Sequence, residues 1–88
     1  VCLVTGATSG IGRATALRMA AEGAAAVVVT GRREALGEAV AAAIRAAGAE
    51  ALFVEADVTH PADAERVVAA GLDRYGRLDA VFNNAGFQ

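Results

Sequence analysis

A glycine-rich stretch near the start of the chain has residue types and spacing that suit phosphate binding. It reads TGATSGIG and lies between an apolar run and an alanine-rich segment. Gly6 permits a tight turn, Gly10 lets a pyrophosphate approach the backbone, and Gly12 lets a following helix lie close to a sheet. The free N–H groups and the dipole of a helix start favour phosphate charge. The residues predicted to bind here are Gly6, Thr8, Ser9, Gly10, Ile11 and Gly12. A P-loop is excluded because no Gly-Lys-Ser/Thr ending follows.

Gly31 and Arg32 follow a second apolar run and bear on which dinucleotide could bind. Domains that bind NAD usually have Asp or Glu about 20 residues beyond the glycine turn, where the carboxylate holds the ribose 2′-OH. Gly31 stands there instead, and the adjacent Arg32 guanidinium can grip a 2′-phosphate. The pattern therefore favours NADP(H) over NAD(H), with Arg32 preferred to Arg33. The alternative is that both arginines are solvated charges at a helix start.

Two further polar groups follow apolar runs. Asp57 can accept a hydrogen bond from an exocyclic amine such as that of adenine, with Val58 packed beside the ring. An Asx-type turn at Asp57, leading to Pro61, is an equally weighted alternative. The segment Asn83–Gly86 offers two amides, one to tie neighbouring strands together and one to face a ribose hydroxyl, and a glycine for close backbone approach. Its alternative is an Asn-Gly type of turn.

The composition excludes several other kinds of site. The 88 residues are 56% hydrophobic and 20% charged, with a net charge of −2. Because the cations are scattered arginines, no basic stripe is available for nucleic acid. Cys2 is the single cysteine, so disulfides and cysteine-based zinc sites are excluded, and His60 is interpreted as a surface residue. No metal ligand set is expected. Apolar stretches stop short of the roughly 18 residues of a membrane span, so we expect no membrane association and a cytoplasmic location.

The segments that carry these residues alternate between strand and helix patterns. Short runs rich in Val and Leu predict strands, and alanine-rich segments with apolar residues three or four apart predict helices. The expected strands are Val1–Thr5, Ala25–Thr30, Ala51–Ala56 and Leu78–Asn83, and the expected helices are Ser9–Glu22, Arg33–Ala47 and Pro61–Tyr75. Because the strands are continuously apolar, both faces of the sheet should be covered, which favours parallel pairing.

Each expected helix has one apolar stripe that should face the sheet. The three stripes are Gly12, Ala16, Met19, Ala20 and Gly23; Leu36, Val40, Ile44 and Ala47; and Ala64, Val67, Val68, Gly71 and Leu72. Glycines at the three helix ends should adopt the left-handed conformation that ends many helices, namely Gly23, Gly48 and Gly76.

This alternation predicts an α/β fold with a Rossmann-type, doubly wound parallel sheet in the order 3-2-1-4 and with three helices. The order reverses between the first and fourth strands, and ligands bind outside the carboxyl ends of strands at such a switch point. All the polar groups above follow strand ends, so the fold should gather them at one edge. Because both ends of the chain look cut, we interpret residues 1–88 as one part of a single, longer domain.

Three motifs, in this order and spacing, resemble those of the classical short-chain dehydrogenase/reductase family. They are Thr5-Gly6-x-x-x-Gly10-Ile11-Gly12, Asp57-Val58 and Asn83-Asn84-Ala85-Gly86. The resemblance covers essentially the whole chain and implies an NAD(P)-dependent oxidoreductase that moves hydride between nicotinamide and a carbonyl or alcohol carbon. It also implies the site: the glycine turn for the phosphates, Arg32 for the 2′-phosphate, Asp57 and Val58 for adenine, Asn84, Ala85 and Gly86 for a ribose region, and Asn83 for sheet stability.

The same resemblance limits what this chain can do alone. The family's catalytic serine, tyrosine and lysine follow the Asn-Asn-Ala-Gly turn, and the chain has no lysine, so no catalytic residue is expected here and Tyr75 should pack against its helix end. Relatives that prefer NADP often have a basic residue just before the middle glycine, where Ser9 stands. A small carbonyl or alcohol substrate and a homo-oligomer of the full-length protein are implied.

Two other functions compete with this interpretation. A non-catalytic dinucleotide-binding or sensing module would keep the fold without the chemistry, and a downstream Tyr-x-x-x-Lys pair with an upstream serine would favour the enzyme instead. An S-adenosylmethionine methyltransferase also has a glycine turn after its first strand. It would have a carboxylate near the end of the second strand, where this chain has Gly31.

Overall fold

The chain folds into alternating strands and helices in the expected order. The computed structural model describes residues 1–6, 10–57 and 60–83, without the side chains of Ile11 and Asn83. Its elements are β1 (Cys2–Thr5), α1 (Gly10–Ala21), β2 (Ala26–Gly31), α2 (Glu34–Ala46), β3 (Glu50–Glu55), α3 (Pro61–Tyr75) and β4 (Ala80–Asn83). The predicted bounds of α3 are confirmed, and the other elements differ from their predicted bounds by one or two residues at an end.

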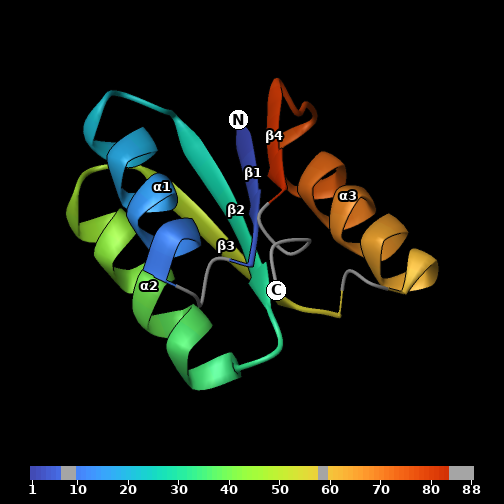
Figure 1. The fold of residues 1–88 in the computed structure, drawn as a ribbon. Coiled ribbons are helices and arrows are strands. Elements are labelled where there is room, and N and C mark those ends of the chain that lie inside the picture. The colour runs from blue at the N-terminus through green and yellow to red at the C-terminus, as the bar shows by residue number, and fades with distance from the viewer. Residues whose placement is uncertain (7–9, 58–59, 84–88) are drawn as a thin grey trace.

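The four described strands form one sheet in the order β3-β2-β1-β4, and all neighbouring pairs are parallel. The predicted order 3-2-1-4 is therefore confirmed. Figure 1 shows α1 and α2 on one face of the sheet and α3 on the other. The chain changes face after β3 and returns through α3 to the far side of β1, which places a switch point between β1 and β4.

Strand β2 shows why the apolar runs have no polar face. All six of its residues are buried. Val27 and Val29 pack with Ile44 of α2 in one hydrophobic cluster, and Val28 packs with Val67 of α3 in another. Since successive side chains of a strand point to opposite faces, a strand between two helical layers buries both sets of side chains, and the run Ala26–Val29 accordingly has no polar position.

The helical stripes are narrower than the sequence pattern predicts. In α2 the buried residues are Gly37, Val40, Ala41 and Ile44, whereas Leu36 is 44% exposed and Ala47 is exposed. In α3 the buried residues are Val67 and Gly71, and the predicted Val68 and Leu72 are exposed. Gly23 is exposed as well. The predictions for these five positions were wrong: Gly23 and Ala47 lie beyond the last residues of α1 and α2, and Leu36, Val68 and Leu72 lie at the margins of their stripes, where the helix turns the side chain off the sheet.

The ends of the helices and strands follow simple backbone chemistry. The predicted left-handed glycines are confirmed, with φ of 99° at Gly23, 98° at Gly48 and 78° at Gly76.

Tyr75 packs at the end of α3 against the cluster around Val28, as expected. Its buried hydroxyl has no hydrogen-bond partner among the described residues.

Strand β4 lies at one edge of the described sheet, beside β1 only. Val81 is 58% exposed and Phe82 is 45% exposed, although both are apolar residues of a strand. An edge strand has one row of unpaired N–H and C=O groups and fewer neighbours over its side chains.

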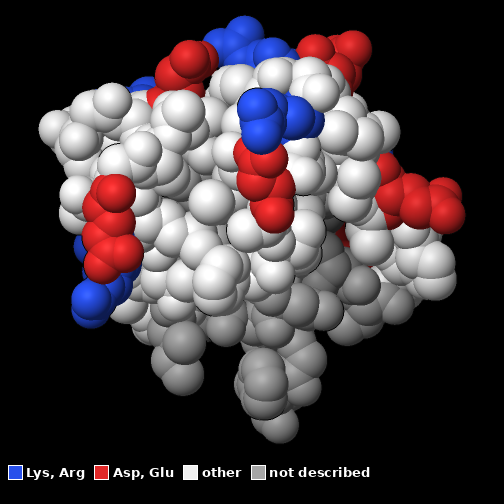
Figure 2. All heavy atoms as spheres, turned by 90° about the horizontal axis from the view of Figure 1, so that it is seen from above, with Lys and Arg blue, Asp and Glu red and all other residues white. Residues whose placement is uncertain are grey.

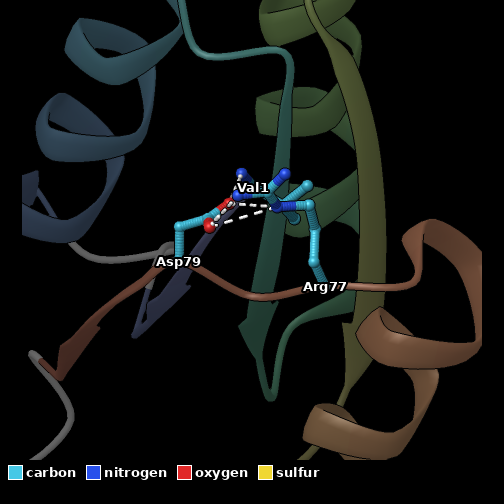
Figure 3. Close-up of polar contacts among 3 residues, drawn as sticks. All are labelled: Val1, Arg77 and Asp79. Carbon is cyan, nitrogen blue, oxygen red and sulfur yellow. Dashed lines mark hydrogen bonds and ion pairs between the residues drawn. The ribbon is translucent and has the colours of Figure 1, made fainter.

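Asp79 joins the starts of β1 and β4, at the edge of the sheet where strands begin. Its carboxylate accepts a hydrogen bond of 2.6 Å from Arg77 Nη2 and one of 2.7 Å from the Val1 amino group (Figure 3). These bonds, with that from Arg77 the larger cause, lower the pKa of Asp79 to about 2, and the same pairing raises the pKa of Arg77. The pair is solvent-exposed, so its electrostatic effect is screened by water and salt.

The surface seen from above this edge is mixed in charge. In Figure 2, blue and red side chains stand singly or in pairs among uncharged ones, and the described residues drawn there form no continuous basic patch. Within the part of the chain that the structure describes, no helix is long and apolar enough to cross a membrane.

Candidate functional site

The carboxyl ends of the parallel strands bring the predicted polar residues to one edge of the sheet. Gly6 follows β1, Arg32 follows β2, Asp57 follows β3 by two residues, and Asn83 ends β4. Thr8, Ser9, Val58, Asn84, Ala85 and Gly86 lie outside the described residues, as does the side chain of Ile11. Their predicted roles stay predictions.

Three glycines of the predicted phosphate-binding turn, Gly6, Gly10 and Gly12, are among the described residues. Gly6 has a φ of 64°, in the left-handed region that side chains disfavour. Gly10 begins α1 and is exposed, and no described atom lies within 4 Å of a Cβ built on it. Gly12 is buried, as expected for a helix that lies close to the sheet. At Gly10, therefore, the first residue of α1 exposes backbone without a side chain.

Two threonine hydroxyls fix the strand ends that carry the site. Thr5 Oγ1 donates to the carbonyl oxygen of Phe82 at 3.3 Å and ties β1 to β4 at the switch point. Thr30, which is fully buried, donates to the carbonyl oxygen of Val54 at 2.7 Å and ties β2 to β3. The Ala56 N–H extends the second pair by donating to the Gly31 carbonyl oxygen at 3.0 Å.

Arg32 and Asp57 lie together across the ends of β2 and β3. Arg32 Nη1 is 3.7 Å from Asp57 Oδ2, and the Arg32 side chain is 76% exposed. The guanidinium thus stands in solvent beside a carboxylate that is only 27% exposed. An exposed guanidinium in such a pair contributes little to stability, so the Arg32 side chain can turn toward a ligand at low cost.

The backbone and side chain of Asp57 take part in separate interactions. Its carbonyl oxygen accepts a hydrogen bond from the His60 N–H at 2.9 Å, and its own N–H donates to Asp63 Oδ2 at 2.9 Å. His60, whose side chain is exposed as predicted, places Nε2 3.4 Å from Asp57 Oδ2. The carbonyl bond is a backbone contact, whereas an Asx-type turn needs a bond to the Asp57 carboxylate from an N–H outside the described part of the chain, so the Asx-turn and ligand-binding interpretations of Asp57 both stay predictions.

An open hollow of about 230 Å³ lies at this end of β3. It is lined by Arg32, Glu55, Ala56, Asp57, Asp63 and Arg66. Sequence reasoning identified two of these residues, Arg32 and Asp57, as ligands and assigned no role at the site to Asp63. It missed Arg66, whose Nη2 donates to the Glu55 carbonyl oxygen at 2.6 Å. Asp63 and Arg66 are three residues apart in the first turns of α3, and this spacing could have indicated that both lie on the same side of the helix.

Comparison with known proteins places this arrangement in a family. The sequence profile of the short chain dehydrogenase family matches residues 1–88. Levodione reductase of Leifsonia aquatica is 47% identical over 89 residues, which cover 100% of this chain and 33% of that protein. The chain therefore belongs to the short-chain dehydrogenase family, as its motifs predicted.

Solved structures of related proteins have the same fold as this chain. The crystal structure of NAD⁺-bound xylitol dehydrogenase gives a TM-score of 0.91 at 40% identity, covering 99% of this chain and 33% of its own. A protein from Burkholderia cenocepacia, solved with bound NADP, gives a TM-score of 0.88 at 35% identity, covering 93% of this chain and 32% of its own. The chain spans about a third of the length of the relatives it matches.

Proposed function

We propose that residues 1–88 are the N-terminal, cofactor-binding part of an NADP(H)-dependent oxidoreductase that interconverts a small carbonyl compound and the corresponding alcohol. The observation that carries the cofactor preference is the position of Arg32. Its exposed guanidinium follows β2, where an NAD-binding domain usually has a carboxylate, and it lies 3.7 Å from Asp57 Oδ2. A planar guanidinium suits a phosphate monoester.

The relatives support the reaction class but leave the cofactor open. Their names include a reductase and a dehydrogenase, and the two solved relatives hold NADP in one case and NAD⁺ in the other. The proposed preference for NADP(H) is therefore argued from Gly31 and Arg32, and not from similarity to these relatives.

The described residues fit an adenine dinucleotide. The N–H groups at the start of α1 would bind the diphosphate next to Gly10, Arg32 would bind the 2′-phosphate, and Asp57 would accept a hydrogen bond from the adenine amine. When bound, the nicotinamide ring supplies or accepts a hydride. No described residue of this chain is assigned a proton-transfer role, in keeping with the family's catalytic residues lying beyond residue 86.

The test is a change of cofactor preference in the full-length protein. Replacing Arg32 with Asp turns a charged contact into repulsion, so the Kd for NADPH should rise about 100-fold while the Kd for NADH changes by less than about threefold. Fluorescence titration with the two cofactors measures both values. Arg33→Ala, which removes an exposed arginine beside the site, is the matched control and should leave the preference unchanged. Equal losses for both cofactors in Arg32→Asp would show that Arg32 does not contact the 2′-phosphate.

A dinucleotide sensor without catalysis is the competing function. Oxidation of NADPH by the full-length protein with a panel of small ketones and aldehydes would favour the enzyme, and binding without turnover across the panel would favour the sensor. The proposal also includes a cytoplasmic location and a homo-oligomeric full-length protein, the latter testable by light scattering.

A further inference from the structure

We propose that Asp63 is a positioning residue for the adenine end of the cofactor site. In this proposal its carboxylate holds the backbone of Asp57, and this hold lets the Asp57 side chain accept a hydrogen bond from the adenine amine. The inference rests on the proposed function, because it presumes that an adenine dinucleotide binds at this edge. It assigns a role to a residue that touches Asp57 rather than the reacting atoms.

The hydrogen bond from Asp57 to Asp63 is unusual for a residue in the first turn of a helix. A carboxylate at the third helical position commonly accepts from the N–H of the N-cap residue, which here is His60. The His60 N–H instead donates to the Asp57 carbonyl oxygen. Asp63 Oδ2 reaches three residues further back and accepts from the Asp57 N–H at 2.9 Å. Its acceptor capacity therefore stabilises the end of the β3 segment instead of its own helix.

Arg66 provides a second attachment from the same helix. Its Nη2 donates to the Glu55 carbonyl oxygen at 2.6 Å and lies 3.8 Å from Asp63 Oδ1. The two side chains thus hold the backbone on both sides of Ala56, which is buried. The guanidinium also offsets the repulsion between the carboxylates of Asp63 and Asp57, which would otherwise oppose the hydrogen bond.

The contacts that Asp63 and Arg66 make with the backbone at the end of β3 lie beside the proposed ligand site. Asp63 and Arg66 line the same hollow as Arg32 and Asp57. A hydrogen bond to a ligand weakens steeply once its geometry is poor, so an acceptor must be held close to its productive position by neighbouring contacts. Charge-assisted hydrogen bonds are the strong kind, and the bond from the Asp57 N–H to a carboxylate is one of them.

The experiment measures recognition of the adenine amine directly. Two probes are titrated into the full-length protein: NADPH, and its analogue with hypoxanthine, in which a carbonyl oxygen replaces the amine. Their ratio of Kd values reports on the amine contact and cancels any general loss of stability. In the unaltered protein we expect the analogue to bind about tenfold more weakly, the worth of one hydrogen bond to a charged group.

Asp63→Ala should lower this ratio to below about threefold, because the Asp57 backbone loses its partner. Asp63→Asn keeps an acceptor oxygen and should retain most of the ratio. Asp73→Ala is the matched control, since it removes an exposed acidic residue from the same helix. A ratio in Asp63→Ala equal to that of the unaltered protein would overturn the proposal. If that variant does not fold, Asp63→Ser decides in its place, because the shorter serine side chain does not reach the Asp57 N–H: a lowered ratio supports the role of Asp63, and an unchanged ratio refutes it.

Asp57→Ala separates this inference from the function on which it rests. If the ratio collapses in Asp57→Ala but not in Asp63→Ala, Asp57 recognises adenine and only the positioning role of Asp63 fails. If the unaltered protein does not distinguish the two probes, the adenine assignment of Asp57 fails, and the inference fails with it.

Discussion

Replacing Gly10 with valine should separate cofactor binding from folding. Gly10 is the first residue of α1, its φ is not in the left-handed region, and no described atom lies within 4 Å of a Cβ built on it. The protein therefore has room for a side chain at this position. The proposed diphosphate does not, because it must approach the N–H groups at the start of the helix.

The two expected effects differ greatly in size. Valine is a slightly better helix residue than glycine, so the free energy of unfolding should change by less than about 0.5 kcal/mol. Binding should lose one or two hydrogen bonds from backbone N–H groups to phosphate, each worth about 1.5–3 kcal/mol. A loss of about 3 kcal/mol raises the Kd more than 100-fold.

Fluorescence titration with NADPH and NADH measures the affinity, and far-UV circular dichroism with thermal unfolding measures the fold. Unlike Arg32→Asp, this variant should weaken both cofactors equally. Ala21→Val is the matched control because it adds a valine to an exposed position at the other end of α1. Retained affinity in Gly10→Val would remove the phosphate-turn assignment. Loss of helical signal together with affinity would show that the space at Gly10 is needed by the protein itself.

Three further predictions concern stability. Gly37→Ala puts a Cβ 2.0 Å from Phe53 Cε1 and should lower the free energy of unfolding by about 1–2 kcal/mol, since overpacking exceeds the gain in helix propensity. Urea unfolding checks this value, and an equally large loss in the control Gly71→Ala, where the nearest contact is 3.3 Å, would contradict it. Pairing with Arg77 lowers the pKa of Asp79 below its usual 3.8, so the small stabilising effect of the pair is present above about pH 4 and is lost as the pH falls through the lowered pKa. The difference in Tm between the unaltered protein and Asp79→Asn should therefore vanish near pH 2, and a constant difference from pH 6 to pH 2 would refute the assignment. The 88 residues produced alone should aggregate in size-exclusion chromatography because Val81 and Phe82 are exposed on an edge strand; a monomer that unfolds cooperatively would disprove this.

The order of helices and strands along the chain and the order of strands in the sheet can both be predicted from the sequence. An error of one or two residues at the end of an element changes neither of them. A strand such as β2, buried at every position and apolar over Ala26–Val29, is typical of a sheet between two layers, and alternation with helices then leaves one common topology. The rotation of each helix is less certain, as Leu36 and Leu72 show, because apolar periodicity does not fix which residue at the margin of a stripe meets the sheet.

The site is predictable to the level of strand ends and no further. Arg32 and Asp57 could be named because each follows an apolar run, and their proximity follows from the parallel pairing of β2 with β3. The bond between the Asp57 N–H and Asp63 could not be predicted, since it depends on the path of the turn between β3 and α3. Local sequence gives the residue types there but not the direction of the chain.

The hydroxyls of Thr5 and Thr30 have a consequence for motion at this edge. Each one cross-links its strand to a carbonyl of the next strand close to the carboxyl end, at Phe82 and at Val54. Strand ends normally fray first, which would let the anchoring points of a bound molecule drift apart. Because β1 is cross-linked to β4 and β2 to β3, we expect the carboxyl ends within each pair to separate less readily than strand ends without such a bond.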